Sequence, residues 1–318
     1  MLSRLWFFVE LIVVCLMIPA TALGHGFANY VHGAKSVAMG NAFTALADDP
    51  TAIFYNPAGI LQLEGTHLSF GLTAFLPDST FKSNGTSDIP GTYAGQTTDL
   101  KDRTWISPNI FLTHKINDRV AVGLGGFSSF GMGTDWPNSW EGRFAVGSTK
   151  SLLNTYSINP VVAYKPIERL SLAFGVVAQR ISFELDNQMW IDLRPLGVSL
   201  PPFEINSSLE GDDWDWGWNA SFLFSITENF TVGASYRSEI THNIRSVDVK
   251  FEPEMSAIGL NNTSSVSRFK TPAILSLGTA WESGPLTLTF DAYWTEWSTY
   301  DKLSLHFDTP VGGVQGWK

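Results

Sequence analysis

The sequence predicts an all-β protein, a transmembrane antiparallel β-barrel whose lumen is plugged by its N-terminal segment. Apolar and polar residues alternate strictly over 66–74, 213–224 and 286–295, without helical periodicity. The chain has 12 Trp, 22 Phe and 8 Tyr but only 16% charged residues. Aromatic girdles at both membrane interfaces explain such a composition. Short connections also alternate with long polar ones, as they do in outer-membrane barrels.

Residues 1–24 are predicted to be a signal peptide. Arg4 supplies the positive start, Leu5–Ile18 is apolar apart from one glutamate, and small residues follow as a cleavage site before His25. A membrane anchor is the alternative, but the apolar run is shorter than the roughly 20 residues that a spanning helix needs. Cys15 is the only cysteine, so we expect neither disulfides nor thiol chemistry in the mature chain.

Residues 25–64 are predicted to form the hatch that plugs the barrel. Apolar residues at roughly helical spacing predict a short helix around Ser36–Leu46. Asp48-Asp49-Pro50 is expected to end it, because proline cannot continue a helix. Asn56-Pro57-Ala58-Gly59 is expected to form a tight turn. A cap on a globular fold is the alternative, and the strands that follow favour the plug.

Residues 65–318 are predicted to supply the barrel strands. Less regular strands than the three named above are expected at about 105–114, 119–130, 154–164, 169–184, 230–240 and 268–281. The short connections are 115–118, 165–168, 227–229 and 282–285, and the long ones are about 76–104, 131–153, 185–212 and 241–267. A soluble β-sandwich is the alternative, but it would not explain why the connection lengths alternate.

The expected number of strands does not fit a closed barrel. We count about nine strands, with a tenth beginning near Trp317. Bacterial single-chain barrels have an even number and must close, because lipid cannot satisfy an open edge. We therefore expect the sequence to be an incomplete reading of a longer protein or a truncated product.

Several classes of function are disfavoured. The net charge of −10 argues against a nucleic-acid partner. The six histidines lack metal-ligand spacing, and Gly123–Gly126 is not a nucleotide loop because no helix follows it. We expect no cofactor and no metal.

The stretch Gly33–Ile60 carries the most specific motif, Ala47-Asp48-Asp49-Pro50 followed by Asn56-Pro57-Ala58-Gly59. With it, the sequence resembles the FadL-type outer-membrane transporters of hydrophobic compounds, whose best-known members import long-chain fatty acids. The resemblance covers essentially all of the mature chain. Supporting motifs lie at 140–144, 217–220, 235–239, 271–273, 296–298 and 316–318. In the family, further strands follow the last of these motifs.

The resemblance implies a 14-stranded barrel with the N-terminal hatch folded inside. Extracellular loops would capture the ligand, which would pass to an apolar interior site beside the hatch. Hatch movement would then let it leave sideways, through an opening made by a kinked strand. This is passive diffusion by a protein that is not an enzyme, and we expect it to act as a monomer in outer-membrane lipid.

The same resemblance implies candidate residues. Asn56, Pro57, Ala58 and Gly59 would be the hatch signature near the wall opening. Phe130 and Gly131 end the third strand, the one that kinks in the family, and a glycine there can break the ladder of hydrogen bonds. A plain turn and an ordinary loop glycine are the alternatives.

Arg180, Gly26 and Phe27 are the candidate ligand-binding residues. Arg180 stands where family members place a basic residue that meets the ligand carboxylate, and arginine offers planar charge-assisted donors. Its place in the alternating pattern of the strand, however, puts it on the same face as Leu172 and Phe174. Either a bulge turns it inward, or it is an arginine that reaches the membrane interface. Gly26 and Phe27 would approach the ligand in the interior.

Other functions remain open at this point. Aromatic hydrocarbons are the alternative substrates, because apolar pockets discriminate poorly between ligands of similar size. A porin for polar solutes is disfavoured by inward positions that are mostly Ser, Thr, Gly and Asn. A lipid-acting enzyme would need a pair such as His67 and Ser69 together with an orienting third group. A structural or adhesive barrel is the last alternative.

Overall fold

The structure is a computed structural model, and it describes residues 26–85, 95–146, 148–191, 194, 199, 201–253, 256, 261–299 and 304–307. The predicted signal peptide and the motif at 316–318 lie outside these residues. Within the described ranges, thirteen antiparallel strands form one large sheet, and β2 (Thr80–Lys82) and β3 (Thr97–Asp99) form a small second sheet. No helix in the described ranges combines the length and the hydropathy needed to cross a bilayer.

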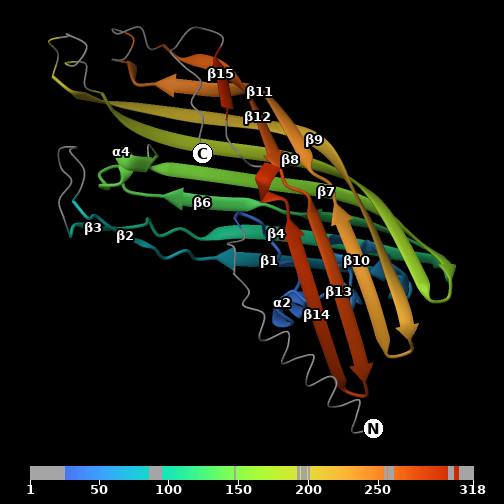
Figure 1. Cartoon of the computed structure of the whole chain (residues 1–318). Coiled ribbons are helices and arrows are strands. Elements are labelled where there is room, and N and C mark those ends of the chain that lie inside the picture. Colours follow the sequence, from blue (N-terminus) through green and yellow to red (C-terminus); the bar gives the residue numbers. More distant parts are fainter. Residues whose placement is uncertain are drawn as a thin grey trace.

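The large sheet follows the order of the chain and is strongly curved (Figure 1). Each strand pairs antiparallel with the next, as expected for strands joined by hairpin connections. Its main path runs through β1 (Thr66–Phe75), β4 (Trp105–Asn117), β5 (Val120–Phe127), β7 (Lys150–Ile167), β8 (Leu170–Ile191), β9 (Phe203–Thr227), β10 (Phe230–Arg237), β13 (Ile274–Ser283) and β14 (Leu286–Thr295).

Four passes of the chain through this sheet are interrupted. The pieces off the main path are β6 (Gly131–Asp135), β11 (Ile240–Phe251), β12 (Thr263–Thr271) and β15 (Ser304–Phe307). β5 and β6 both pair with β7, and β10 and β11 both pair with β9. In the same way β12 and β13 form one pass, and β14 and β15 another. With β1, β4, β7, β8 and β9, the described residues make nine passes, close to the number that the sequence indicates.

Two of the connections expected to be long loops are largely strand. β8 continues to Ile191, β9 begins at Phe203, and β11 and β12 occupy most of 241–267. Charged residues hide the alternation there. Val249 is buried beside its partner Leu209, whereas the neighbouring Lys250 and Glu210 form an exposed ion pair. The expected single strand at 268–281 is instead split before β13, at Pro272, which has no N–H for a ladder.

The outer face of the sheet is apolar. On β1, Leu68, Phe70 and Leu72 are each about two thirds exposed or more. On β14, Leu286, Leu288 and others are exposed in the same alternating pattern. A soluble sandwich would bury such faces against a second sheet. A continuous apolar surface of this kind suits contact with lipid.

The inner side of the curve holds the N-terminal segment, here residues 26–62. It carries α2 (Ala34–Ala38), α3 (Ala52–Tyr55) and the 3₁₀ helix η1 (Pro57–Gln62). Both ends of the sheet contact it. Thr73 on β1 donates to the Val31 carbonyl at 3.0 Å, and the Thr44 amide donates to Asp291 on β14 at 2.7 Å. The sheet therefore wraps around the segment.

The expected helix at 36–46 is shorter in the structure and ends at Ala38. Gly40 and Asn41 have φ angles of 65° and 63°, a left-handed conformation that no α-helix can continue. The amides of Phe43 and Thr44 are thereby freed to bind the Asp291 carboxylate. Tertiary contacts with β14 thus replace helical hydrogen bonds.

Candidate functional site

The third pass of the sheet breaks away from its neighbour. β5 pairs with β4 only as far as Gly126 opposite Ile110, and β6 pairs with β7 instead. Trp105–Asn109 of β4 keeps its pairing with β1. In the described part of the chain, this stretch has no strand partner on its other side. The result is an interruption of the wall between β4 and β6, at the position where the sequence predicts a kink.

The start of the N-terminal segment lies at this interruption. Ala28 and Phe130 form an isolated antiparallel bridge. The Asn29 amide donates to the Ser129 carbonyl at 2.8 Å, and the Gly131 amide donates to the Phe27 carbonyl at 2.9 Å. On the other side, Asn29 Nδ2 donates to Ser107 Oγ on β4 at 2.9 Å. Residues 27–29 therefore link both edges of the interruption.

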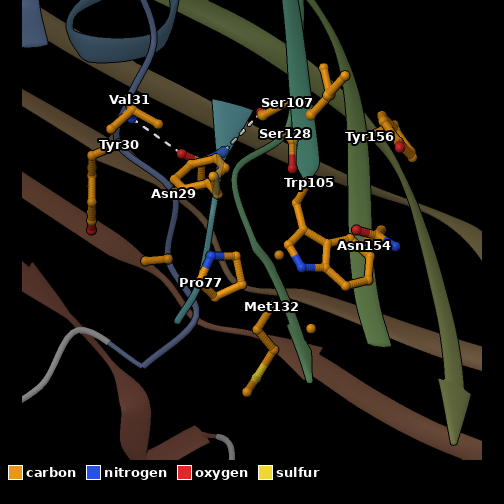
Figure 2. A pocket seen from close by; sticks show the side chains of 15 residues that line it. Asn29, Tyr30, Val31, Pro77, Trp105, Ser107, Ser128, Met132, Asn154 and Tyr156 are labelled. Atoms are coloured by element: carbon orange, nitrogen blue, oxygen red, sulfur yellow. Dashed lines mark hydrogen bonds between the residues drawn. The ribbon is translucent and has the colours of Figure 1, made fainter. Parts of the chain in front are cut away.

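A cavity of about 270 Å³ opens beside these residues. Figure 2 shows the hydrogen bond between Asn29 and Ser107, with Trp105, Pro77 and Met132 on the same side of the cavity. A Cβ at Gly133 would lie 2.7 Å from Trp105 Cζ2, so a glycine is needed for the indole to lie against β6. The lining is mainly apolar and aromatic and comprises Ala28, Asn29, Tyr30, Val31, Phe75, Pro77, Trp105, Ile106, Ser107, Ser128, Gly131, Met132, Gly133, Asn154 and Tyr156.

The predicted ligand residue Phe27 and the predicted gate residue Phe130 are brought together. Their ring centroids are 5.9 Å apart, and the Phe27 ring also lies 4.8 Å from that of Trp297. Gly26 has φ 54°, and a Cβ there would stand 2.7 Å from the Trp297 indole. Gly131 begins β6 directly after the kink. These four predicted residues thus form one aromatic-lined group at the interruption.

The signature Asn56–Gly59 lies elsewhere. Asn56 is fully buried, and its Nδ2 donates to the carbonyls of Thr44 (2.7 Å) and Phe222 on β9 (2.9 Å). The Ala58 amide donates to Ser221 Oγ at 3.1 Å. We expected these residues near the wall opening, but in the structure Asn56 and Ala58 contact β9 and not the interruption between β4 and β6. Buried amide groups need partners, and Asn56 and Ala58 find theirs on β9 and at the Thr44 carbonyl.

Two further members of this signature have local roles. Pro57 opens η1, where its missing N–H leaves no donor unsatisfied. Gly59 packs so closely on Ala47 that a Cβ would overlap the Ala47 carbonyl oxygen. The signature thus anchors the N-terminal segment to itself and to β9.

Arg180 points away from the other candidates. It lies on the outer face of β8 with exposed Leu172 and Phe174, and its Nη2 is 3.1 Å from Asp212 Oδ2. The register between β8 and β9 is continuous along the whole pairing. No bulge there turns Arg180 inward, and its geometry fits the alternative of an arginine on the outer surface.

Arg237 is a buried cation that the sequence reasoning did not single out. It is 6% exposed and lies with its guanidinium 5.0 Å from the Phe127 ring and 5.5 Å from the Phe54 ring. Its place in the alternating pattern of β10 could have identified it, because it shares the inward face of that strand with Gly233 and Ser235. A charged residue on an inward face is a candidate for function.

The polar groups of the N-terminal segment near Arg237 are uncharged. Burial lowers the pKa of His32 to about 3, although the Ser128 backbone opposes this shift. Burial also raises the pKa of Tyr30, whose hydroxyl lies 2.8 Å from Thr295 Oγ1. Of these three neighbouring groups, the arginine is therefore the charged one, and His32 and Tyr30 are not.

The pair His67 and Ser69, which a lipid-acting enzyme would need, does not form a catalytic arrangement. His67 Nε2 contacts the Glu64 carbonyl at 2.7 Å. Within the described ranges, no hydrogen bond joins this imidazole to the Ser69 hydroxyl. The pair thus lacks the contact that a nucleophile and its base require.

Comparisons with known proteins agree with this architecture. The model of the family described as "Outer membrane protein transport protein (OMPP1/FadL/TodX)" matches residues 13–318. The chain therefore belongs to this family of transport proteins, and it is an outer-membrane protein.

Individual relatives cover most of the chain. It is 26% identical to the long-chain fatty acid transport protein of Salmonella typhi, over 85% of this chain and 61% of that protein. A FadL homologue of Pseudomonas aeruginosa superposes with a TM-score of 0.72 at 21% identity, covering 89% of this chain and 73% of that one. The toluene transporter TbuX of Ralstonia pickettii gives 0.65 at 19%, covering 90% and 78%. These structural likenesses concern the fold, and the chain spans about three fifths of the Salmonella relative.

Proposed function

We propose that the protein lets hydrophobic small molecules diffuse passively across the outer membrane, with long-chain fatty acids as its main substrates. The observation that carries this proposal is the interruption between β4 and β6, where an apolar-lined cavity adjoins the start of the N-terminal segment. A pore for polar solutes has no use for a gap in its wall. A lipid-soluble ligand can leave through one.

The contacts at the interruption support a route for the ligand. A ligand captured among the outer loops reaches the interior beside residues 25–64, which act as the hatch. Residues 27–29 are held at the gap by the three hydrogen bonds to Ser129, Gly131 and Ser107. Their displacement joins the cavity to the outer face. The exposed apolar side chains of that face contact membrane lipid, and a single copy completes this path, so we propose a monomer.

Aromatic hydrocarbons are the second candidate substrates. The cavity volume of about 270 Å³ is small for a ligand pocket, and four aromatic side chains line it. This lining suits a compact aromatic ring as well as one end of a fatty-acid chain. TbuX of Ralstonia pickettii, which has a similar fold, is a toluene transporter.

Uptake measurements test the proposal. Bacteria lacking their own transporter of this kind should gain uptake of radiolabelled oleate when they express the protein as its gene encodes it. Toluene in excess should compete if the two substrates share the cavity. We expect at least tenfold faster oleate entry than in vector controls and no gain for sugars. Equal entry of oleate with and without the protein, or a gain for sugars alone, contradicts the proposal.

A further inference from the structure

The outer face of the sheet changes from apolar to charged part of the way along β8 and β9. Toward the short turn that joins β7 to β8 it carries exposed apolar side chains, such as Leu172 on β8 and Trp216 on β9. Toward the long connection between β8 and β9 it carries carboxylates, with Glu184 directly opposite Glu210. In outer-membrane barrels the short turns are periplasmic and the longer loops extracellular. The boundary therefore lies on the side of the outer leaflet, where the lipid headgroups begin.

Three arginines lie along this boundary on neighbouring strands. Arg180 is on β8, and Asp215 of β9 is one residue from the position opposite it. The Asn243 amide of β11 donates to Asp215 Oδ2 at 3.1 Å, which brings β11 to the same level of the wall. On β12, Arg268 is opposite Asn243, and its Nε donates to the Asn243 Oδ1 at 3.2 Å. Arg245 is exposed two residues further along β11, where the register with β12 shifts, and such a bulge can re-aim a side chain.

Arg245 and Arg268 lack a carboxylate partner. Arg180 has one, because its Nη2 lies 3.1 Å from Asp212 Oδ2 on the same face. Among the described residues, the ion pairs include neither Arg245 nor Arg268, although both side chains are exposed. Two neighbouring guanidinium groups on the outer face are thus free to bind an anion.

A tryptophan accompanies the arginines at the boundary. Trp214 is 48% exposed on the outer face of β9 and lies directly opposite Arg180. Tryptophan is enriched where a membrane meets water, because its large ring is apolar and its N–H is polar. The position of this ring therefore agrees with a boundary at the level of the lipid headgroups.

The wall beyond the boundary offers polar groups. A cavity of about 320 Å³ lies further along the same strands. Ser208 on β9 lies between Asp186 on β8 and Lys250 on β11, and all three line this cavity. The remaining lining is mostly amide, hydroxyl and carboxylate side chains, and it comprises Asn138, Thr149, Asn187, Gln188, Asn206, Ser207, Phe251 and Glu252. Such a surface suits the hydroxyl groups of a sugar, since each of them both donates and accepts hydrogen bonds.

We propose that Arg245 and Arg268 bind the phosphate of a phosphorylated glycolipid in the outer leaflet. The acyl chains of this lipid lie on the apolar part of the outer face, and its sugars lie against the polar wall beyond the boundary. The forked N–H donors of a guanidinium match the oxygens of a phosphate, and basic residues at a membrane surface favour anionic lipids. This lipid contact goes beyond the proposed function and is independent of the transported substrate.

A lipid with and without its phosphates separates the charge from the apolar contacts. Binding of lipid A, a diglucosamine lipid with two phosphates, to the detergent-purified protein is measured by native mass spectrometry. The wild type should bind it at least about tenfold more tightly than the same lipid with both phosphates removed. Arg245→Gln combined with Arg268→Gln should lower the affinity for the phosphorylated lipid about tenfold. Affinity for the dephosphorylated lipid should stay unchanged, and the corresponding pair of lysine substitutions should retain part of the preference.

Arg119→Gln combined with Arg169→Gln is the matched control. It removes two exposed arginines from the short turns, with the same change in net charge, and should leave both affinities unchanged. Equal weakening by the two double variants would show that net charge alone attracts the lipid, and it overturns the proposal. Unchanged binding by the variant of Arg245 and Arg268 overturns it as well. So does displacement of the lipid by equimolar inorganic phosphate, or a dimer of the protein that occupies this face instead.

Discussion

At the scale of single residues, glycines set how closely the N-terminal segment approaches itself and the wall. A Cβ at Gly59 would overlap the Ala47 carbonyl, and Cβ atoms at Gly123 and Gly125 would each stand 2.8 Å from the Ile53 side chain. Gly131 is different, because the atom nearest to an added Cβ, the Leu153 carbonyl oxygen, is 3.6 Å away. Position 59 therefore has no room for a Cβ, whereas position 131 has.

This difference predicts opposite outcomes for two alanine substitutions. Gly59→Ala should lower the free energy of unfolding by about 1–3 kcal/mol, because overpacking forces the buried turn apart. Gly131→Ala should stay within about 0.5 kcal/mol, as for substitutions that remove no special feature. Urea unfolding in lipid vesicles, followed by tryptophan fluorescence, measures both. Equal destabilisation by the two would show that the close approach at Gly59 is not what constrains this residue.

Sequence reasoning identified some site residues and missed others for physical reasons. The resemblance implied Phe27 as a ligand residue and Phe130 as a gate residue, far apart in the chain, and their ring centroids lie 5.9 Å apart. Arg180 was a candidate ligand residue whose strand pattern left its facing open, and the structure places it on the outer face. Arg237 stayed inconspicuous, because its burial without an ion-pair partner among the described residues depends on which side chains pack around it. That is a property of the folded contacts and not of the local pattern.

At the scale of elements, the third pass is the feature that distinguishes this sheet from a continuous wall. β8 and β9 pair without a break over Leu170–Ile191, whereas the pairing of β5 with β4 ends at Gly126. Strands were predicted well where apolar residues alternate, as in β14, whose bounds match those expected. The strands β11 and β12 were missed, because many of their paired residues are polar and only a few apolar residues alternate along them. Register shifts there further blur the pattern.

The interruption predicts uneven exchange of backbone amides. Amides of residues 105–109 that face β6 should exchange hydrogen for deuterium at least about tenfold faster than those of 172–178, because they have no strand partner on that side and open without breaking a ladder. Mass spectrometry of peptides from the protein in vesicles measures this. The central strands β8 and β9 supply the internal control. Protection at 105–109 equal to that at 172–178 would mean that the wall is continuous at this point.

At the scale of the whole molecule, the sheet carries apolar residues outward and wraps around a packed N-terminal segment. Val31 and Thr44 of this segment contact β1 and β14, the two ends of the main path. Its signature residues bind β9, whereas residues 27–29 lie at the interruption. The segment is thus anchored to β9 at one place and meets the interruption at the other. We propose that the end at the interruption is the part that moves when a ligand leaves.

A reversible cross-link tests this central claim most directly. Ala28 and Phe130 face each other in an antiparallel bridge whose flanking hydrogen bonds mark a close, non-hydrogen-bonded pair, a spacing within the range of disulfides. The only natural cysteine is Cys15, so Ala28→Cys combined with Phe130→Cys gives one defined cross-link. If residues 27–29 control the exit, oxidation lowers oleate uptake at least about tenfold, and a reductant restores it in the same cells. Equal uptake by the oxidised and reduced forms would contradict it, because the ligand would then leave by a path that residues 27–29 do not control.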